Sequence, residues 1–365
     1  MKKILQVLTD TNIGGAGIYL LNYLAARDRD DFETAVVLPR GAALIPSVEK
    51  TGARVIEAEK IADRSYSKEG TNELCAIFRR EKPDLVHTHA SLSARIAAKK
   101  CKIPIVNTRH CLEDPKPFPK NLIYRALNNA LSDRVIAVSR AVEQNLLRDG
   151  IARKKLRMIY NGIPPQPQYT EDERNAFREK FGLSGVCVGI VARLEPVKNH
   201  ALFLRAAELC ALAREKSGES ELTFVIAGGG SLENDLRERA QTDASHAKVL
   251  FLGQVETVSR LFCALDIAVL TSTHEALSLS LIEAMAQARP VVSTRSGGPE
   301  ELITPNENGF LCGHDEESLS EAILALARDG ALREKFGRAG KARAAEFSAE
   351  NMARKIEDVY RELLK

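Results

Sequence analysis

The sequence contains no tryptophan, and aromatic residues make up only 5% of its 365 positions. Because proteins stack single-stranded bases on aromatic side chains, this shortage argues against nucleic acid as a partner. No stretch approaches the roughly 18 consecutive apolar residues that a membrane-spanning helix needs. The chain turns polar by Thr9 and Asp10, so no signal peptide is predicted at its start.

Charge and cysteine content exclude further classes of protein. The 52 basic residues are nearly balanced by 49 acidic ones, and a net charge of +3 indicates no partner by itself. The seven cysteines are scattered and form neither C-x-x-C nor a zinc-ligand spacing with histidine. We expect them to be free thiols in a reducing cytoplasm. With 44% hydrophobic and 28% charged residues, the composition is typical of a soluble globular protein.

Short runs rich in Val, Ile and Leu alternate with segments that have apolar residues every three or four positions. At about 150 residues per domain, a chain of this length predicts two domains. The alternation predicts an α/β fold, with a parallel sheet covered by helices on both faces in each domain. We expect strands at 3–9, 34–39, 54–57, 85–89, 105–108, 134–139, 186–192, 222–227, 249–253, 267–271 and 291–294, and helices at 17–27, 71–82, 201–214, 232–241, 278–288 and 349–364.

The two halves of the chain meet at 161–167, where an Asn-Gly pair and three prolines interrupt any regular element. We therefore predict an N-terminal Rossmann-like domain at 1–163 and a C-terminal one at 164–345, both doubly wound and facing each other across a cleft. A final helix at 346–365 carries an apolar stripe and is expected to pack back toward the N-terminal domain. Ligands of such domains bind outside the carboxyl ends of the strands.

Two glycine-rich loops follow predicted strands. In Gly14-Gly15-Ala16-Gly17, glycines would let the backbone approach an anion at a helix N-terminus. Position 20 is Leu, so the loop does not complete the G-x-G-x-x-G pattern of dinucleotide sites. The second loop, Gly228-Gly229-Gly230, has a similar setting. Each loop by itself fits a plain tight turn as well as a ligand contact.

Two clusters of charged residues lie in the second half. Arg193 and Lys198 follow the first strand there, and cations at this spacing can grip a diphosphate from two sides, although a solvated loop also fits. Glu275 and Glu283 stand eight positions apart around an apolar segment. A carboxylate at 283 is costly unless donors such as a ribose diol meet it, and a salt-bridged core glutamate is the alternative. The helix N-terminus near Ser278 can face phosphate.

Taken in order, these motifs resemble glycosyltransferase family 4, the retaining nucleotide-sugar transferases with two Rossmann-like domains known as the GT-B fold. The resemblance covers nearly the whole chain and includes the segment 296–301 and Asn-Gly pairs at 161–162 and 308–309. It implies transfer of a sugar from a nucleotide diphosphate sugar to a hydroxyl acceptor. By family frequency we expect UDP as the nucleotide and cell-envelope polysaccharide or glycolipid synthesis as the setting.

The resemblance also implies roles for individual residues. Glu283 would bind the ribose hydroxyls and Glu275 the donor sugar, while Arg193 and Lys198 would neutralise the diphosphate. His110, which follows a predicted strand of the N-terminal domain, would lie at the sugar. Further donor contacts are expected, some of them at the nucleotide base, from Gly14, Gly15, Gly17, Gly228, Val255, Glu256, Ser278 and Leu279.

Several alternatives stay open. His87 and His89 compete with His110 for an active-site role, and a nucleotide-sugar epimerase or hydrolase on the same fold is the alternative function. Asp28-Arg29-Asp30 has the D-x-D pattern of metal-dependent glycosyltransferases, but it lies between a predicted helix and strand, so we expect a surface turn. Arg193 and Lys198 can supply the charge that a metal supplies elsewhere, and neither a metal nor another cofactor is expected.

Positive charge is concentrated between residues 95 and 157, which contain 15 lysines and arginines against 5 acidic residues. Apolar residues from Phe118 to Leu131 recur there at roughly helical spacing. A basic amphipathic surface suits an anionic membrane or an anionic acceptor such as a lipid-linked saccharide. A core-facing helix flanked by ordinary surface cations is the alternative. We therefore expect a cytoplasmic enzyme that this surface would hold at the inner face of the membrane.

Overall fold

The computed structural model describes residues 1–115 and 117–365, and the chain divides into two compact units. The N-terminal unit comprises Met1–Pro164 together with Phe347–Lys365, and the C-terminal unit comprises Pro165–Glu346. The division falls between two prolines of the segment 161–167. The end of the chain belongs to the N-terminal unit.

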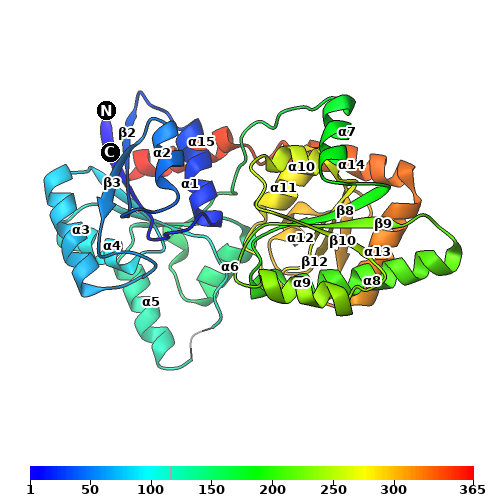
Figure 1. The fold of residues 1–365 in the computed structure, drawn as a ribbon. Coiled ribbons are helices and arrows are strands. Elements are labelled where there is room, and N and C mark those ends of the chain that lie inside the picture. The colour runs from blue at the N-terminus through cyan, green and yellow to red at the C-terminus, as the bar shows by residue number, and fades with distance from the viewer. Residues whose placement is uncertain (116) are drawn as a thin grey trace. The chain divides into compact units, whose positions relative to one another are not determined.

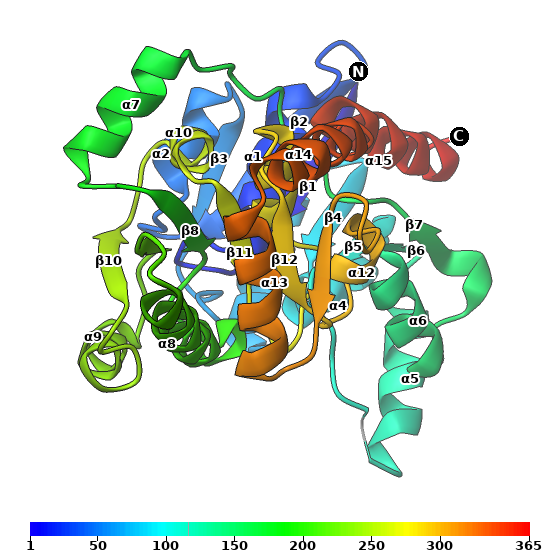
Figure 2. The ribbon, with the colours of Figure 1, turned by 90° about the vertical axis from the view of Figure 1, so that its right-hand side faces the viewer.

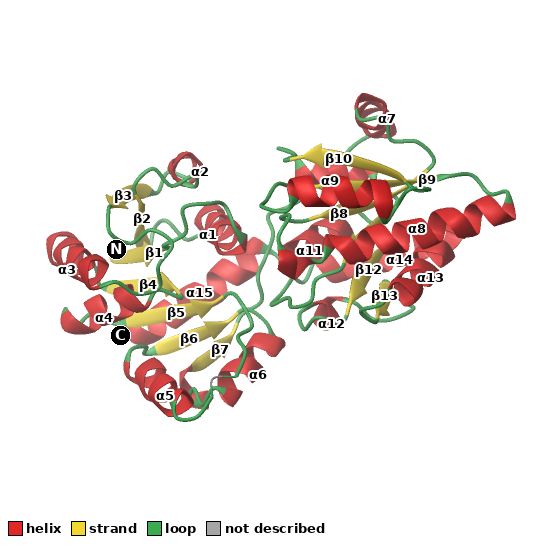
Figure 3. Cartoon of the chain, turned by 60° about the horizontal axis from the view of Figure 1, so that its bottom comes forward, coloured by secondary structure: helices red, strands yellow, loops and turns green. Residues whose placement is uncertain are grey.

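The N-terminal unit (Figure 1) is built on a seven-stranded parallel sheet with the strand order β3-β2-β1-β4-β5-β6-β7, whose strands are labelled in Figure 3. The direction of winding reverses between β1 and β4, as in other doubly wound sheets. The predicted Rossmann-like architecture is thus confirmed. The edge strand β7 was not predicted, because three residues are too few for a recognisable apolar run. The strands are β1 (Lys2–Val7), β2 (Phe32–Pro39), β3 (Arg54–Ala58), β4 (Leu85–His89), β5 (Ile105–Arg109), β6 (Arg134–Ala137) and β7 (Leu156–Met158).

Helices cover both faces of this sheet (Figure 3). They are α1 (Gly15–Ala26), α2 (Ile45–Lys50), α3 (Lys68–Glu81), α4 (Leu92–Lys100), α5 (Lys120–Ala130), α6 (Arg140–Arg148) and α15 (Ala349–Leu363). Apolar residues of α3 and α4 form one core with Leu5 and Val7 of β1. Because side chains alternate along a strand, Gln6 points to the opposite face, where α1 and α15 pack against each other.

The last helix, α15, packs on α1 of the N-terminal unit. Met352, Ile356 and Tyr360 are buried along its apolar stripe. The backbone of Gly162 passes so close to the start of α15 that a Cβ atom there would lie 2.2 Å from the carbonyl oxygen of Ser348. Only glycine permits this contact, which closes the N-terminal unit around the returning chain.

The C-terminal unit has a six-stranded parallel sheet with the order β10-β9-β8-β11-β12-β13 (Figure 2). Its strands are β8 (Val186–Val191), β9 (Leu222–Ala227), β10 (Lys248–Gly253), β11 (Ile267–Leu270), β12 (Val291–Thr294) and β13 (Gly309–Cys312). Winding reverses between β8 and β11, which makes this a second doubly wound sheet, as expected. The short edge strand β13 had not been predicted.

The helices of the C-terminal unit are α7 (Glu171–Lys180), α8 (His200–Ser217), α9 (Glu233–Thr242), α10 (Val258–Ala264), α11 (Leu279–Ala286), α12 (Pro299–Leu302), α13 (Glu316–Arg328) and α14 (Gly330–Ala344). Helices α8 and α13 pack against each other, and their apolar side chains form one core with strands β8 and β9. Helix α11, which carries Glu283, packs against α10 and α14.

Helix α5 presents an unusual apolar surface. Four large apolar side chains on it or just before it are exposed to between 42% and 78%, namely Phe118, Leu122, Ile123 and Leu127. Within the described ranges, no helix is both long and apolar enough to cross a membrane. All seven cysteines are free thiols.

Candidate functional site

The loops that carry the predicted charged residues follow the two strands at which the C-terminal sheet reverses its winding. Arg193 and Lys198 follow β8, and Glu275 follows β11, the strand beside it. At such a switch point ligands bind in the crevice outside the carboxyl ends of the strands. Residues far apart in sequence therefore meet there.

Lys198 and Glu275 form an ion pair, with 2.6 Å between Nζ and Oε2, and their side chains are only 18% and 13% exposed. The hydroxyl of Ser272 donates to the same carboxylate oxygen at 2.9 Å. The backbone holds both partners in place, because the Thr271 hydroxyl donates to the Lys198 carbonyl at 2.8 Å and the Thr273 amide donates to the Val197 carbonyl at 2.9 Å. The pair is thus a fixed feature of the edge between β8 and β11.

A second loop holds Glu275 from the other side. The Glu275 amide donates to the Ser296 carbonyl, and the Gly298 amide donates to the Glu275 carbonyl, each at 2.8 Å. A Cβ atom at Gly298 would lie 2.4 Å from the carbonyl oxygen of Ala276. The glycines of the segment 296–301 therefore let the β12 loop pair with the Glu275 loop, a role that spacing alone could not reveal.

Arg193 is the exposed cation of the site. No hydrogen bond or ion pair involves its guanidinium in the part of the chain that the structure describes, whereas Lys198 is neutralised by Glu275. An unpaired guanidinium presents donors in a fork that matches phosphate oxygens. The two predicted cations therefore lie in one loop but in different electrostatic settings.

Glu283 lies on α11 between the buried residues Ile282 and Ala284. Burial raises the pKa of its carboxyl group to about 7. Across the described residues, no hydrogen bond or ion pair reaches this carboxylate, so the salt-bridged alternative for Glu283 does not hold in this structure. A carboxylate in this setting is stabilised by any ligand that brings hydroxyl donors.

Ser278 caps α11: its hydroxyl oxygen accepts from the Leu281 amide at 3.3 Å, and Leu279 is the first helical residue. The first backbone N–H groups of this helix lie near the Glu275 loop, where the helix dipole favours negative charge. Val255 and Glu256 lie beyond β10, and the Glu256 side chain is exposed.

The predicted glycines have different surroundings. A Cβ atom at Gly14 or Gly15 would meet nothing within 4 Å, so these two leave open space at the start of α1. At Gly17 it would press on Leu44 at 3.3 Å, and at Gly228 it would lie 2.0 Å from the carbonyl oxygen of Ala192. Gly228 also has φ at +140°. Close packing against the backbone therefore requires glycine at 228, whereas at 17 only the Leu44 side chain would have to shift.

His110 belongs to the N-terminal unit, where it closes a cluster of three histidines. The ring nitrogen Nε2 of His110 lies 2.9 Å from Nδ1 of His89, and His89 stacks on His87 with ring centroids 4.9 Å apart. Tyr19 packs edge-on against His110 with 4.7 Å between centroids. Burial lowers the pKa of all three imidazoles, that of His89 to about 3, so they are neutral at pH 7.

Sequence reasoning missed three buried polar residues. Gln6 and Tyr360 hydrogen-bond to the histidine cluster. Gln6 is a polar residue inside an apolar strand, and Tyr360 had been interpreted only as part of the apolar stripe of the last helix. His200 opens α8, directly after the Lys198 loop, and burial together with the charge of Lys198 lowers its pKa to about 4. A lone polar residue inside an apolar run was the available signal for Gln6.

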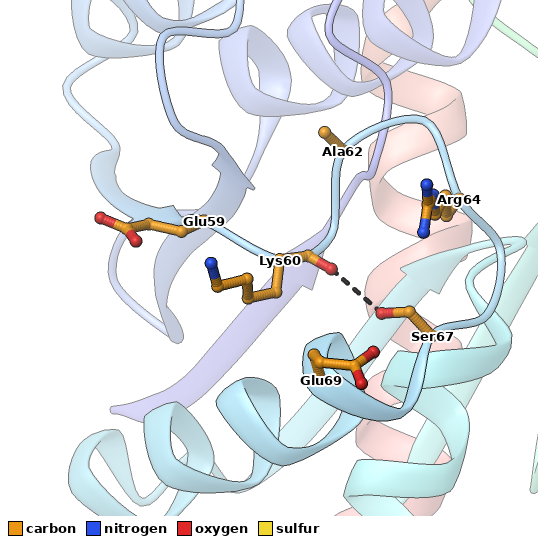
Figure 4. Close-up of a pocket in the computed structure, with 6 residues that line it drawn as sticks. All are labelled: Glu59, Lys60, Ala62, Arg64, Ser67 and Glu69. Atoms are coloured by element: carbon orange, nitrogen blue, oxygen red, sulfur yellow. Dashed lines mark hydrogen bonds between the residues drawn. The ribbon is translucent and has the colours of Figure 1, made fainter.

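An open pocket of about 430 Å³ lies elsewhere on the N-terminal unit, beyond the end of β3 (Figure 4). The Ser67 hydroxyl donates to the Lys60 carbonyl at 3.1 Å across it. Its lining contains none of the predicted site residues; it consists of Glu59, Lys60, Ala62, Arg64, Ser67 and Glu69.

The D-x-D pattern lies in a turn, as predicted. The Asp28 carboxylate accepts from the backbone amides of Asp30 and Asp31 at 2.9 Å and 3.1 Å. Within residues 1–115 and 117–365, no group of three or more His, Cys, Asp or Glu side chains is arranged to hold a metal ion.

Two family models match consecutive parts of the chain. Residues 13–166 match glycosyltransferase family 4, and residues 172–343 match the group 1 glycosyl transferases. The UDP-Gal:alpha-D-GlcNAc-diphosphoundecaprenol alpha-1,3-galactosyltransferase of Escherichia coli is 28% identical over 274 residues, which cover 71% of this chain and 70% of that protein. The N-acetyl-alpha-D-glucosaminyl L-malate synthase of Bacillus anthracis is 23% identical over 381 residues, which cover 100% of this chain and 98% of that protein.

The fold also matches solved structures. HepE of Anabaena, solved in complex with UDP and glucose, superimposes with a TM-score of 0.87 at 22% identity, covering 99% of this chain and 100% of that one. The matching family models, the curated relatives and the two doubly wound sheets agree with the resemblance seen in the sequence. The chain belongs to the family 4 type of glycosyltransferases and has the GT-B fold.

Proposed function

We propose that this protein is a retaining glycosyltransferase that moves a sugar from a UDP-sugar to a hydroxyl acceptor without a metal ion. The observation that carries this proposal is the Lys198–Glu275 ion pair at the switch point of the C-terminal sheet. A cation and a carboxylate held together there suit the two ends of a sugar diphosphate, because the cation can meet the phosphates and the carboxylate can accept from sugar hydroxyls.

The main task of catalysis is to stabilise the leaving diphosphate. As the bond between the sugar and the diphosphate breaks, negative charge develops on the phosphate oxygens. Arg193 and Lys198, together with the N-terminus of α11 behind Ser278, stabilise that charge. The acceptor oxygen attacks the anomeric carbon on the face that the diphosphate leaves, and its proton passes to a phosphate oxygen of the leaving group. The configuration is therefore retained, and no covalent intermediate is required.

The remaining donor contacts follow from the chemistry of each group. Glu283 accepts hydrogen bonds from the ribose hydroxyls, which supply the donors that its carboxylate lacks in the free protein. Gly14 and Gly15 leave the backbone accessible at the start of α1. In the N-terminal unit, His110 forms a hydrogen bond with a hydroxyl of the sugar. In the C-terminal unit, Val255 and Glu256 are the expected contacts of the nucleotide base.

For the acceptor, we favour a lipid-linked saccharide of the cell envelope. The name of the E. coli relative specifies a diphosphoundecaprenol-linked acceptor. The exposed apolar side chains of α5, together with the exposed Lys99, Lys100 and Lys102, are suited to such a lipid and to an anionic membrane. This supports a cytoplasmic enzyme working at the inner face of the membrane.

The test begins with the donor. Thermal unfolding would be followed with UDP-, GDP- and ADP-sugars, since a ligand at 100 times its dissociation constant adds roughly 2.7 kcal/mol of stability. We expect UDP-sugars to give the largest shift. The donor alone would then be followed by NMR, because rapid epimerisation or hydrolysis without acceptor would favour the alternative enzyme class. Transfer to a lipid-linked acceptor with the anomeric configuration preserved is the expected result.

A further inference from the structure

A continuous chain of hydrogen bonds joins His110 to the C-terminal helix within the N-terminal unit. His110 Nε2 lies 2.9 Å from His89 Nδ1, and His89 Nε2 lies 3.1 Å from the side-chain oxygen of Gln6. The Gln6 side-chain nitrogen donates to the Tyr360 hydroxyl at 2.9 Å. Gln6 and Tyr360 are both fully buried, and 354 positions separate them.

The alternation of side chains explains why these groups share one layer. Leu5, Val86 and Ile105 of the three central strands belong to the core under α3 and α4. Gln6 and His87, their neighbours in β1 and β4, therefore lie on the face that α1 and α15 cover. The strand register pairs Gln6 with His87 directly. Tyr360 of α15 lies over both, because its hydroxyl also lies 2.6 Å from His87 Nδ1.

The direction of each hydrogen bond in this series follows from which atoms carry a hydrogen. The amide oxygen of Gln6 only accepts, so His89 Nε2 must carry a hydrogen. A neutral imidazole has one N–H, and the low pKa of His89 keeps it neutral, so its Nδ1 accepts. His110 Nε2 must then donate. Since His110 is also neutral, its Nδ1 is left as a bare acceptor, and that atom has no hydrogen-bond partner among the described residues.

We propose that Gln6 and Tyr360 are positioning residues that hold His110 in its Nε2–H tautomer, so that Nδ1 accepts a hydrogen bond from a hydroxyl group of the bound sugar. Tyr360 acts by accepting from the side-chain nitrogen of Gln6 while its own hydroxyl hydrogen is directed to His87 Nδ1, 2.6 Å away. This arrangement keeps the side-chain oxygen of Gln6 turned toward His89. The consequence for sugar binding rests on the proposed function, whereas the tautomer itself does not.

Rotating the Gln6 amide by half a turn would reverse every bond. The amide nitrogen would then donate to His89 Nε2, His89 Nδ1 would donate to His110 Nε2, and His110 Nδ1 would become a donor. The same residues thus determine whether the candidate catalytic histidine accepts or donates. Removing the Tyr360 hydroxyl leaves the amide nitrogen without its partner and removes the preference between the two directions.

The test reads the tautomer directly, on the full-length protein without donor. Histidine ¹⁵N NMR distinguishes a protonated from a bare ring nitrogen, and the His110 signals are assigned by their loss in His110→Asn. We expect Nε2–H and bare Nδ1 in the wild type, and both tautomers in Tyr360→Phe and Gln6→Met. Tyr169→Phe is the matched control, since it removes a tyrosine hydroxyl bonded to Ser259 at 2.7 Å in the other unit.

A wild-type His110 that carries its hydrogen on Nδ1 would overturn the proposal, and so would an unchanged tautomer ratio in folded Tyr360→Phe. Donor binding is measured separately. If half of the molecules hold the wrong tautomer, the apparent dissociation constant of a UDP-sugar should rise about twofold in Tyr360→Phe, while that of UDP alone should not change. Because the NMR result needs no ligand, a failure of the transferase proposal would leave it standing.

Discussion

The ammonium of Lys198 and the carboxylate of Glu275 are 2.6 Å apart, although 77 positions separate them in the sequence. Each follows a strand at the point where the C-terminal sheet reverses its winding, and backbone hydrogen bonds fix both loops. In the free protein the two charges neutralise each other. An incoming diphosphate would compete with Glu275 for Lys198, which frees the carboxylate to accept from the sugar.

Replacing Lys198 by alanine should therefore abolish most turnover. It would leave the charge on the leaving diphosphate without this partner, at a cost on the order of 3 kcal/mol, or about a hundredfold in kcat. Steady-state kinetics with UDP-sugar and acceptor would measure the effect. Lys216→Ala, at an exposed end of α8, is the matched control and should leave kcat unchanged. Near wild-type turnover in folded Lys198→Ala would remove Lys198 from the mechanism.

Glu283→Gln should stabilise the free protein at alkaline pH while weakening nucleotide binding. The carboxyl group has a pKa of about 7 in the folded protein and about 4.3 when unfolded, so its favourable contribution is complete below pH 4.5 and is lost as pH rises through 7. Glutamine avoids that loss. Urea unfolding should give a gain of roughly 1–3 kcal/mol at pH 8 and little at pH 4.5.

The same substitution should lower the affinity for UDP, because an amide is a weaker acceptor for ribose hydroxyls than a carboxylate. Isothermal titration at pH 8 would measure this. If Glu283 bonds ribose, UDP binding near pH 7 should also release protons, since hydroxyl donors favour the ionised carboxylate. Unchanged UDP affinity would contradict the assignment of Glu283.

The histidine cluster should make the protein sensitive to mild acid. His87, His89 and His110 stay neutral when folded because burial lowers each pKa, whereas in the unfolded chain they bind protons below about pH 6.5. Stability is therefore complete above pH 6.5 and falls as pH decreases toward 3. Each neutral histidine contributes on the order of 1.4 kcal/mol per pH unit to this loss.

Urea unfolding at pH 7, 6 and 5 would measure the slope, and His87→Gln should make it shallower by about one proton. His246 is the control, because it is exposed in the other unit and Glu208 raises its pKa, which gives the opposite dependence on pH. His246→Gln should not reduce the loss at acid pH. A slope that His87→Gln does not change would mean that His87 titrates in the folded protein.

The surface formed by α5 and the basic residues around it should bind anionic bilayers. Lys99, Lys100 and Lys102 are exposed, and each cation near such a membrane contributes about 1 kcal/mol, screened over about 8 Å at physiological salt. Sedimentation with phosphatidylglycerol vesicles should show binding that weakens as salt increases. Reversing these three charges should reduce it, while Lys216→Glu should not. Equal binding to neutral vesicles, or none, would leave an enzyme with a soluble acceptor.

The sequence by itself determined the architecture, because periodicity is a local property. The bounds of β4 and β9 agree with the predicted runs at 85–89 and 222–227, and the stripe of α15 was visible in its spacing. The order of motifs also identified the family. The edge strands β7 and β13 were not predicted, because they are strands by virtue of their pairing with β6 and β12 and not by their composition.

Only the tertiary structure decided which side chains meet. Nothing local in the sequence says that Gln6 faces Tyr360, or that the loop at 296–298 supports Glu275, because these contacts depend on strand order and on which face a residue takes. Spacing likewise could not separate glycines that leave open space, such as Gly14, from those that packing requires, such as Gly228. Burial follows from the assembled fold, and burial sets the pKa values of Glu283 and the histidines on which the chemistry of this protein depends.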